Sequence, residues 1–565
     1  MQSLLESQTF QVPWDNGLAL EWLSMQGVKG EGPMEQSLSG KNDGRNLISY
    51  LVLITLLAAA VRGYIWFMSP VVNPDGVLYI HQARAFYHGQ WEDLTNCSLS
   101  FFSIYPLLVA LIYPFFHDWV SSARIISILF GSLTVAPVYL MARRFASSEA
   151  AILTSVLFAV LPGASGAAGQ IVRDLVCWFF LAWGMYLVVS QMEKPAFKAS
   201  LFLSCLCFLL ASWARVEAFL FIILSVVFLA LRGGEGRAER ILYFSLPLAI
   251  TFALGILLGP LCGLDMAKAF RLREIADKIL EPWGAYVGLR GELKGLSRIV
   301  EGEALRHFFS QARHNAWLLA AISLAGYVLK AFLYFYFILF AAGIWKAKEI
   351  SGGIKSVVYP IMISSGALLL LYVHLIHTWV MDTRFVMIFV IPSLCFVAAG
   401  IDYTFMVLGR RLRLSFRTAF LLVLMFIILI GVWNDLRFSE RDKSIFKEIG
   451  EAVAAASAPG KEALVVSSLH TVRWVSFYAN MHIAGAPCPQ PYSDFRAVLG
   501  KDYNEMTKNL KAMGASHLLW EERHWPQGTF DLLKNADSGH LKRLGSWYHP
   551  DTGEMILFRC VWEQM

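Results

Sequence analysis

Residues 418–433 read Thr418-Ala-Phe-Leu-Leu-Val-Leu-Met-Phe-Ile-Ile-Leu-Ile-Gly-Val-Trp433, an apolar run without a charged side chain. A bilayer's hydrocarbon layer is about 30 Å thick, so roughly 20 apolar helical residues cross it. The run is continuous and does not alternate every second residue, which predicts a helix rather than a barrel strand. Similar stretches recur from Leu47 onward, and 56% of the 565 residues are hydrophobic whereas 16% are charged. This composition predicts a multi-spanning α-helical membrane protein.

Eleven such spans are expected, at residues 47–68, 120–141, 148–165, 172–190, 198–214, 216–231, 241–261, 326–344, 356–375, 385–407 and 417–434. With this count the basic clusters all fall on one side, which the positive-inside rule assigns to the cytoplasm. These clusters lie at 41–45, 143–144, 194–198, 232–240, 346–355 and 410–417.

One apolar stretch is left out of this count. Residues 101–116 are short and contain Pro106 and Pro114, so we expect a re-entrant or interfacial element there. Residues 1–46 have no basic region followed by an apolar one, and we expect them to form a cytoplasmic tail rather than a cleaved signal.

The N-terminus is therefore expected inside and the C-terminus outside, on a cell or inner membrane with a periplasmic or other extracytoplasmic face. The membrane domain should span residues 47–434 and carry two large outer loops, 69–119 and 263–325. Residues 435–565 are more charged and alternate apolar strands with helices, which predicts an extracytoplasmic α/β domain.

Four segments support that α/β prediction: strands at 462–467, 516–520 and 554–562, and an amphipathic helix at 472–480. A βαβ unit is expected at the start of the domain. The sequence has no Gly-rich phosphate loop, and neither a nucleotide nor a nucleic-acid partner is expected.

The cysteines carry little information by spacing. Five of the eight lie in or beside predicted spans, among them Cys262. Cys97, Cys488 and Cys560 lie in outer segments, in a compartment that permits disulfides, and a Cys488–Cys560 bridge is one pairing that this allows.

The first outer loop contains Asn73-Pro-Asp-Gly-Val-Leu-Tyr-Ile-His-Gln-Ala-Arg-Ala-Phe-Tyr-His-Gly89, in which a helix is expected to begin at Asp75. A carboxylate here lies where the membrane meets water. It either caps the helix or serves a reaction. A second acid, Asp174, lies at the top of the fourth span, where it either pairs with Arg173 or Arg215 or has a functional role.

Several motifs in this order resemble the GT-C glycosyltransferases, in particular the branch of the protein O-mannosyltransferases and the lipid A aminoarabinose transferase. The matching segments are Asn73-Pro-Asp75-Gly, Tyr105-Pro-Leu-Leu, Ala123-Arg124-Ile-Ile-Ser, Tyr139-Leu-Met-Ala-Arg-Arg144, Arg215-Val-Glu217 and Thr383-Arg384-Phe-Val with Pro392.

The resemblance implies a polyprenyl-phosphate-linked sugar as donor and a lipid, glycan or protein as acceptor. It places Asp75 at the catalytic centre and Asp174 at a second acidic position. Family members often carry two adjacent acids in the first loop, whereas this sequence has Asn73 and Asp75. A divalent cation is therefore left open, and no metal ligand is assigned.

Transfer from such a donor needs a base for the acceptor hydroxyl and a cation for the departing phosphate. Asp75 is the predicted base. Lys330, Arg215 and Arg384, all expected near outer span ends, are the predicted phosphate-binding residues. Lys330 alternatively extends its ammonium group to the membrane surface. Tyr79, His81 and Glu217 are the remaining predicted substrate contacts.

Three alternatives share these features. A transporter or flippase of lipid-linked sugars should show related halves, and no internal repeat is evident in the sequence. An oligosaccharyltransferase or oligosaccharide ligase would differ only in the size of the donor and the identity of the acceptor. A scaffold that recruits partners through residues 435–565 would tolerate loss of Asp75.

Overall fold

The computed structural model describes residues 41–97, 99–193, 198–232, 236–258, 271–350, 354–469, 471–489, 494–526, 530–535 and 539–562. The predicted tail before residue 41, Cys262 and residues 263–270 of the second outer loop lie outside this part of the chain.

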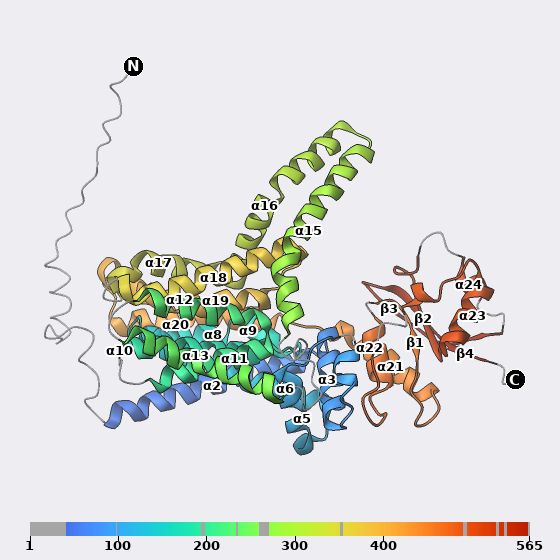
Figure 1. Ribbon diagram of the computed structural model, residues 1–565, viewed down its shortest axis with the longest axis horizontal. Helices are drawn as coiled ribbons and strands as arrows, with labels where there is room; N and C mark the ends of the chain where they lie inside the picture. Colours follow the sequence, from blue (N-terminus) through green and yellow to red (C-terminus); the bar gives the residue numbers. More distant parts are fainter. Residues whose placement is uncertain are drawn as a thin grey trace. The chain divides into compact units, whose positions relative to one another are not determined.

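Apolar helices make up most of the molecule, as the composition predicts (Figure 1). Within the described residues, seven helical segments are long and apolar enough to cross a membrane. They comprise α2 (Lys41–Met68), α6 with α7 (Trp119–Leu133 and Val135–Ala142), α10 (Asp174–Glu193), α13 (Arg237–Leu258), α18 (Ile354–Thr378), α19 (Thr383–Leu412) and α20 (Phe416–Leu436). The described count reaches nine if each of two bent helix pairs is one span. The predicted number of eleven stays a prediction.

The first bent pair joins α8 (Ser148–Ala159) to α9 and η1 (Pro162–Ser165 and Gly166–Ala168) at an angle of 54°. In the second, α16 (Glu303–Ala331) meets α17 (Phe335–Ile350) at 104°. Leu333 and Tyr334 at this break have φ angles of 51° and 59°, which interrupt a right-handed helix. The prediction of one continuous span over 326–344 is therefore wrong.

Three apolar helices are shorter: α5 (Ile104–Phe116), α11 (Ala199–Ala214), and η2 with α12 (Val216–Ala218 and Phe219–Leu231). The 13 residues of α5 extend only about 20 Å at 1.5 Å per residue, too short to cross the hydrocarbon layer. This length agrees with leaving residues 101–116 out of the span count. Two further helices, α3 (Pro74–Tyr87) and α4 (Asp93–Asn96), lie in the first outer loop.

Helix α19 forms much of the core of the helical bundle and is buried continuously from Val386 to Ile401. It packs against α17 through two glycines. A Cβ atom on Gly343 would lie 1.7 Å from the Phe396 carbonyl oxygen, and one on Gly400 would lie 1.9 Å from that of Leu339. Only glycine allows this backbone approach, a common mode of helix packing in membranes.

The two ends of α19 mark two sides of the bundle. Near its C-terminal end, Asp402 accepts a hydrogen bond from the Ser147 backbone N–H at 2.7 Å, which joins the predicted cytoplasmic connection at 142–147 to the inner end of the predicted span 385–407. At its start, Arg384 contacts the first outer loop at Asp75. The predicted inner and outer connections thus meet at different ends of this helix.

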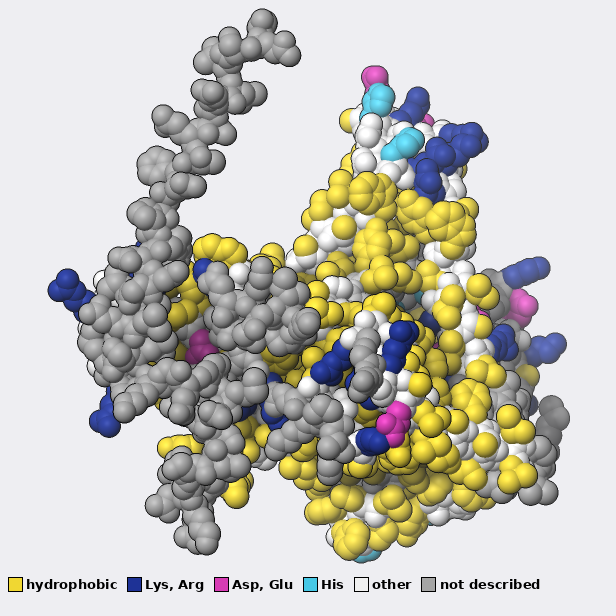
Figure 2. Space-filling model, turned by 60° about the vertical axis from the view of Figure 1, so that its left-hand side comes forward, with side chains coloured by type: hydrophobic (Ala, Val, Ile, Leu, Met, Phe, Trp, Pro, Cys, Tyr) yellow, Lys and Arg dark blue, Asp and Glu magenta, His cyan; other side chains and the backbone are white. Residues whose placement is uncertain are grey.

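The surface of the bundle is apolar. Figure 2 shows a face on which hydrophobic side chains cover much of the described surface and charged ones are few. Large apolar side chains such as Phe67, Leu231 and Leu421 are 71%, 77% and 60% exposed. Such a surface is stable against lipid rather than water.

Two long helices, α15 (Leu272–Ile299) and α16, run side by side as a hairpin (Figure 1). Most of the second predicted outer loop therefore forms helices.

The C-terminal region contains a four-stranded sheet in the order β1-β2-β4-β3, with helices packed against it. The strands are β1 (Val465–Val466), β2 (His517–Glu521), β3 (Leu541–His549) and β4 (Gly553–Cys560). The helices are η3 (Arg441–Lys443), α21 (Ser444–Ala456), α22 (Val472–Ala479), η5 (Phe495–Ala497), α23 (Tyr503–Met513) and α24 (Leu532–Asn535).

Strands β1 and β2 are parallel, with Val465 opposite His517, and α22 and α23 lie between them in the chain. This confirms the predicted βαβ unit and the approximate positions of three strands. The sequence prediction missed β3, an edge strand whose middle residues are mostly exposed and whose pairing shifts register between Arg543 and Gly545. Its polar pattern lacks the apolar alternation used to find strands. The exact domain limits, 47–434 and 435–565, stay predictions.

Candidate active site

Helix α3 begins with an Asn-Pro-Asp sequence, and Asn73 is its capping residue. The Asn73 side chain accepts a hydrogen bond from the Gly76 backbone N–H at 3.0 Å, and Pro74 occupies the first helical position. Asp75 is therefore inside the first turn, and its carboxylate is not the cap. This corrects the capping alternative for Asp75 and leaves that side chain available for other contacts.

Arg384, from the start of α19, is the ion-pair partner of Asp75. Its Nη2 lies 2.9 Å from Asp75 Oδ2, and its Nη1 is 3.5 Å from Gln170 Oε1. Asp382 caps α19 by accepting from the Arg384 N–H at 3.1 Å. The Asp75 side chain remains 46% exposed, whereas that of Arg384 is only 15% exposed. Asp75 thus has a fixed cationic neighbour and an open side.

The open side of Asp75 faces a cavity of about 240 Å³. Five parts of the chain that are distant in sequence meet there: the first outer loop, the segment before α10, the start of α19, the segment after α20 and α22. The lining residues are Val71, Val72, Asn73, Pro74, Asp75, Gln170, Asp382, Arg384, Glu440, Lys443 and Trp474.

Asp174, the first residue of α10, belongs to a second and more buried charge cluster. Arg215 contacts Asp174 Oδ1 and also donates to Glu217 Oε1 at 3.0 Å. Lys278 Nζ from α15 lies 2.7 Å from the same Glu217 oxygen. The Asp174 side chain is only 5% exposed. Of the two ion pairs predicted for Asp174, the structure forms the one with Arg215.

The Phe385 ring lies between the two clusters. The Arg215 guanidinium carbon is 4.7 Å from the ring centroid, and that of Arg384 is 5.1 Å away. The charge of Asp174 also acts on Arg384. Cation–ring contacts of this kind hold guanidinium groups in place without neutralising them.

Tyr79 of α3 faces the same region. Burial raises the pKa of Tyr79, so its phenol stays protonated and can donate a hydrogen bond. The structure therefore brings together six of the eight predicted site residues. These are Asp75, Tyr79, Asp174, Arg215, Glu217 and Arg384.

Arg173 is a further candidate that the sequence analysis did not assign to the site. Its guanidinium carbon lies 4.6 Å from the Phe101 ring centroid and 5.9 Å from that of Tyr79. Among the described residues, none accepts a hydrogen bond from its buried Nη1. A buried donor without a partner is costly, so this group is suited to an anionic ligand. Its position directly before Asp174 was the available signal.

His81 and Lys330 lie apart from these clusters. Both His81 ring nitrogens face backbone carbonyls, Nδ1 that of Pro487 at 3.2 Å and Nε2 that of Asp93 at 3.3 Å. Burial lowers the pKa of His81. Lys330 is exposed in the last turn of α16 and does not line the cavity. Among the described residues, no contact supports the predicted substrate-binding role of His81 or the predicted phosphate-binding role of Lys330.

The cysteine pairing differs from the one considered from sequence. Cys97 of the first outer loop is bonded to Cys488 of the C-terminal region, 391 residues away, and Cys560 is free and buried. The Cys488–Cys560 alternative is therefore wrong. In the described part of the chain, no group of three His, Cys, Asp or Glu side chains is arranged to hold a metal ion.

Comparisons with known proteins concern the sequence family and the fold. Residues 104–258 match the family model of dolichyl-phosphate-mannose-protein mannosyltransferase. No curated protein sequence matches the chain.

Two solved proteins share the fold over most of this chain. The oligosaccharyltransferase AglB of Archaeoglobus fulgidus, in complex with an inhibitory peptide and a dolichol-phosphate, is 13% identical with a TM-score of 0.55, covering 92% of this chain and 74% of its own. ArnT of Cupriavidus metallidurans bound to undecaprenyl phosphate is 15% identical with a TM-score of 0.51, covering 91% of this chain and 98% of its own. The predicted resemblance is thus confirmed, and the chain has the fold of the GT-C glycosyltransferase superfamily.

Proposed function

We propose that this protein is an integral membrane glycosyltransferase that moves a sugar from a polyprenyl-phosphate-linked donor to an acceptor hydroxyl. The observation that carries the proposal is the partly exposed Asp75 carboxylate, paired with Arg384 beside a cavity at a span end. The dolichol-phosphate and undecaprenyl phosphate complexes of the two structural matches support the donor class. The family-model match supports sugar transfer.

Asp75 acts as the general base in this mechanism. The acceptor oxygen forms a bond with the anomeric carbon while the bond from that carbon to the phosphate oxygen breaks, and the acceptor proton passes to Asp75. Arg384 donates a hydrogen bond to Asp75 Oδ2 and fixes the direction of the carboxylate. General-base catalysis of this kind contributes about 10²–10⁴-fold to a rate.

Arg173 is the best-supported phosphate-binding residue. The charge of Arg215 is compensated by Asp174 and Glu217, and Arg384 is engaged by Asp75. The buried Nη1 of Arg173 has no hydrogen-bond acceptor among the residues that the structure describes. It can therefore donate to the leaving phosphate without first breaking an ion pair. This assignment replaces Lys330 as the leading candidate.

The active site is proposed to face away from the cytoplasm, with the N-terminus inside. The Cys97–Cys488 bond supports this orientation, because it joins two segments predicted to be outside and disulfides persist mainly outside the reducing cytosol. Asp551, whose side chain is 83% exposed, is a convenient probe position. Asp551→Cys should react with an impermeant thiol reagent in intact cells. Reaction only after lysis would reverse the orientation.

The function is tested by incubating purified protein in detergent with polyprenyl-phosphate sugars and candidate acceptors. A transferase releases polyprenyl phosphate and forms a glycosylated product without any sealed compartment. Transport of the intact lipid in vesicles, with no transfer in detergent, would instead establish the transporter alternative.

The oligosaccharyltransferase alternative concerns the acceptor and has support from the AglB match. It is tested in the same assay with an asparagine sequon peptide and an oligosaccharide donor. Transfer to the peptide amide in place of a hydroxyl would establish it.

A further inference from the structure

The C-terminal region contacts the loop that carries Asp75. Val72 lies three residues before Asp75 and is fully buried. Its backbone N–H donates to the Tyr478 hydroxyl at 2.9 Å, and its carbonyl accepts from Trp474 Nε1 at 2.5 Å. Both backbone polar groups of Val72 are therefore held by side chains of α22.

These two side chains are themselves fixed within the C-terminal region. The Trp474 ring stacks on Phe446 of α21, with centroids 4.8 Å apart and planes 10° apart. Tyr478 is 6% exposed, and its β-carbon packs beside Gly450 of α21. A rigid support of this kind can hold a loop peptide more precisely than the loop alone.

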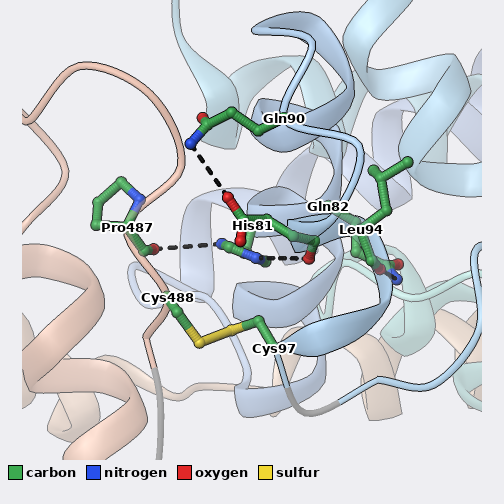
Figure 3. Close-up of a disulfide and its surroundings, with 8 residues drawn as sticks. His81, Gln82, Gln90, Leu94, Cys97, Pro487 and Cys488 are labelled. Atoms are coloured by element: carbon green, nitrogen blue, oxygen red, sulfur yellow. Dashed lines mark hydrogen bonds between the residues drawn. A yellow bond between two sulfur atoms is a disulfide. The ribbon is translucent and has the colours of Figure 1, made fainter.

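The opposite end of α3 is fastened to the same region. Arg84 Nε donates to the Gly485 carbonyl at 2.9 Å, and its Nη2 contacts the carbonyl of Ile483. Figure 3 shows the neighbouring disulfide between Cys97 and Cys488, with His81 directed at the Pro487 carbonyl.

We infer that the C-terminal region is a positioning element of the active site, which holds Asp75 against Arg384. It does so through hydrogen bonds to the Val72 backbone and through contacts at the C-terminal end of α3. Trp474 and Tyr478 are positioning residues in this account. The inference rests on the proposed function for its kinetic consequence, because a displacement of about 1 Å at a reacting group can cost as much as 10²-fold in rate.

The most direct test removes single polar atoms from the contacts that Trp474 and Tyr478 make with the Val72 backbone. Tyr478→Phe deletes the hydroxyl that accepts from Val72, and Trp474→Phe deletes the indole donor while keeping an aromatic ring. Each should lower kcat about tenfold. Tyr478 does not line the cavity, so Tyr478→Phe should also leave the donor KM within about twofold. Tyr503→Phe is the matched control, because the Tyr503 hydroxyl is buried in the same region without a partner among the described residues.

Hydrogen exchange provides a readout that needs no substrate. Amide exchange in residues 71–80 should accelerate in Tyr478→Phe and Trp474→Phe but not in Tyr503→Phe, while residues 386–401 of α19 stay protected. Unchanged exchange and unchanged kcat in both variants would overturn the positioning role. Hydrogen exchange does not depend on turnover. The positioning inference can therefore fail while the transferase proposal stands, and the transferase proposal can fail while the exchange result still supports positioning.

The covalent anchor is tested by Cys97→Ser combined with Cys488→Ser, with Cys560→Ala as control. We expect kcat to fall several-fold, and reductant to lower wild-type kcat to the level of the double variant without affecting that variant further. Alkylation and mass spectrometry would verify reduction of the bond. Full wild-type kcat with the bond demonstrably open would remove the disulfide from the positioning element.

Discussion

Asp75 and Asp174 occupy similar positions in their helices but have different surroundings. Both are aspartates in the first turn of a helix, and each has an arginine partner from a distant segment. The Asp75 side chain is 46% exposed and faces a cavity, whereas that of Asp174 is 5% exposed within a network of charges. In the proposed mechanism, this contrast distinguishes the acid that receives the acceptor proton from one that holds the site together.

The largest effect is expected at the exposed acid. Asp75→Asn keeps the side chain's shape but cannot accept a proton at neutral pH, so kcat should fall by about 10²–10⁴-fold, or roughly 3–5 kcal/mol of transition-state stabilisation. The melting temperature should change little. Asp118→Asn is the matched control, because Asp118 caps α6 through the Ser121 N–H and does not line the cavity. More than about a tenth of the wild-type rate in Asp75→Asn would refute the base assignment.

The buried acid should affect stability more than chemistry. Asp174→Asn leaves the buried Arg215 with only Glu217, and we expect a loss of about 2–3 kcal/mol of unfolding free energy, at the low end for a broken buried pair. Thermal unfolding in detergent measures this loss. If Asp174→Asn folds normally yet loses as much kcat as Asp75→Asn, the distinction between the two acids fails.

A buried histidine of the C-terminal sheet should also affect stability, in a way that depends on pH. Burial lowers the pKa of His517 to about 4, well below its unfolded value near 6.5. The unfolded state therefore binds the proton first, and stability falls as the pH drops from about 6.5 towards 4. Between pH 7 and pH 5 the loss should be about 2 kcal/mol. His517→Gln should weaken the dependence of the melting temperature on pH. If the dependence is unchanged in this variant, other groups are responsible for it.

The smallest effect concerns donor binding. Arg173→Gln removes a guanidinium whose buried Nη1 has no acceptor among the described residues. It should raise the donor KM about tenfold, about 1.4 kcal/mol, with Arg173→Lys intermediate. Initial rates at varied donor concentration measure it. Lys330→Gln is the control and should behave as wild type, since Lys330 is exposed and outside the cavity lining. A raised donor KM in Lys330→Gln together with a wild-type KM in Arg173→Gln would restore Lys330 as the phosphate-binding residue.

Local sequence patterns were sufficient for much of the architecture. Continuous apolar runs predicted the spanning helices, and apolar segments predicted β2 and β4, because hydrophobic patterning depends on nearby residues. The same reasoning failed at residues 326–344, where the sequence is apolar apart from Lys330 but two positive φ angles at Leu333 and Tyr334 bend the chain. An apolar run indicates that a segment avoids water, but it does not show that the segment is one straight helix.

The sequence by itself also determined which residues could do chemistry: Asp75, Asp174 and the arginines near span ends are visible as charges beside apolar runs. Only the tertiary structure decided their partners. Asp75 and Arg384 are 309 residues apart, and Cys97 and Cys488 are 391 apart. No short-range pattern encodes such a pairing, because ion pairs and disulfides depend on distances of a few ångströms that packing alone sets. For the same reason, the roles of Arg173, Trp474 and Tyr478 emerged only when the helices and the C-terminal sheet were in place.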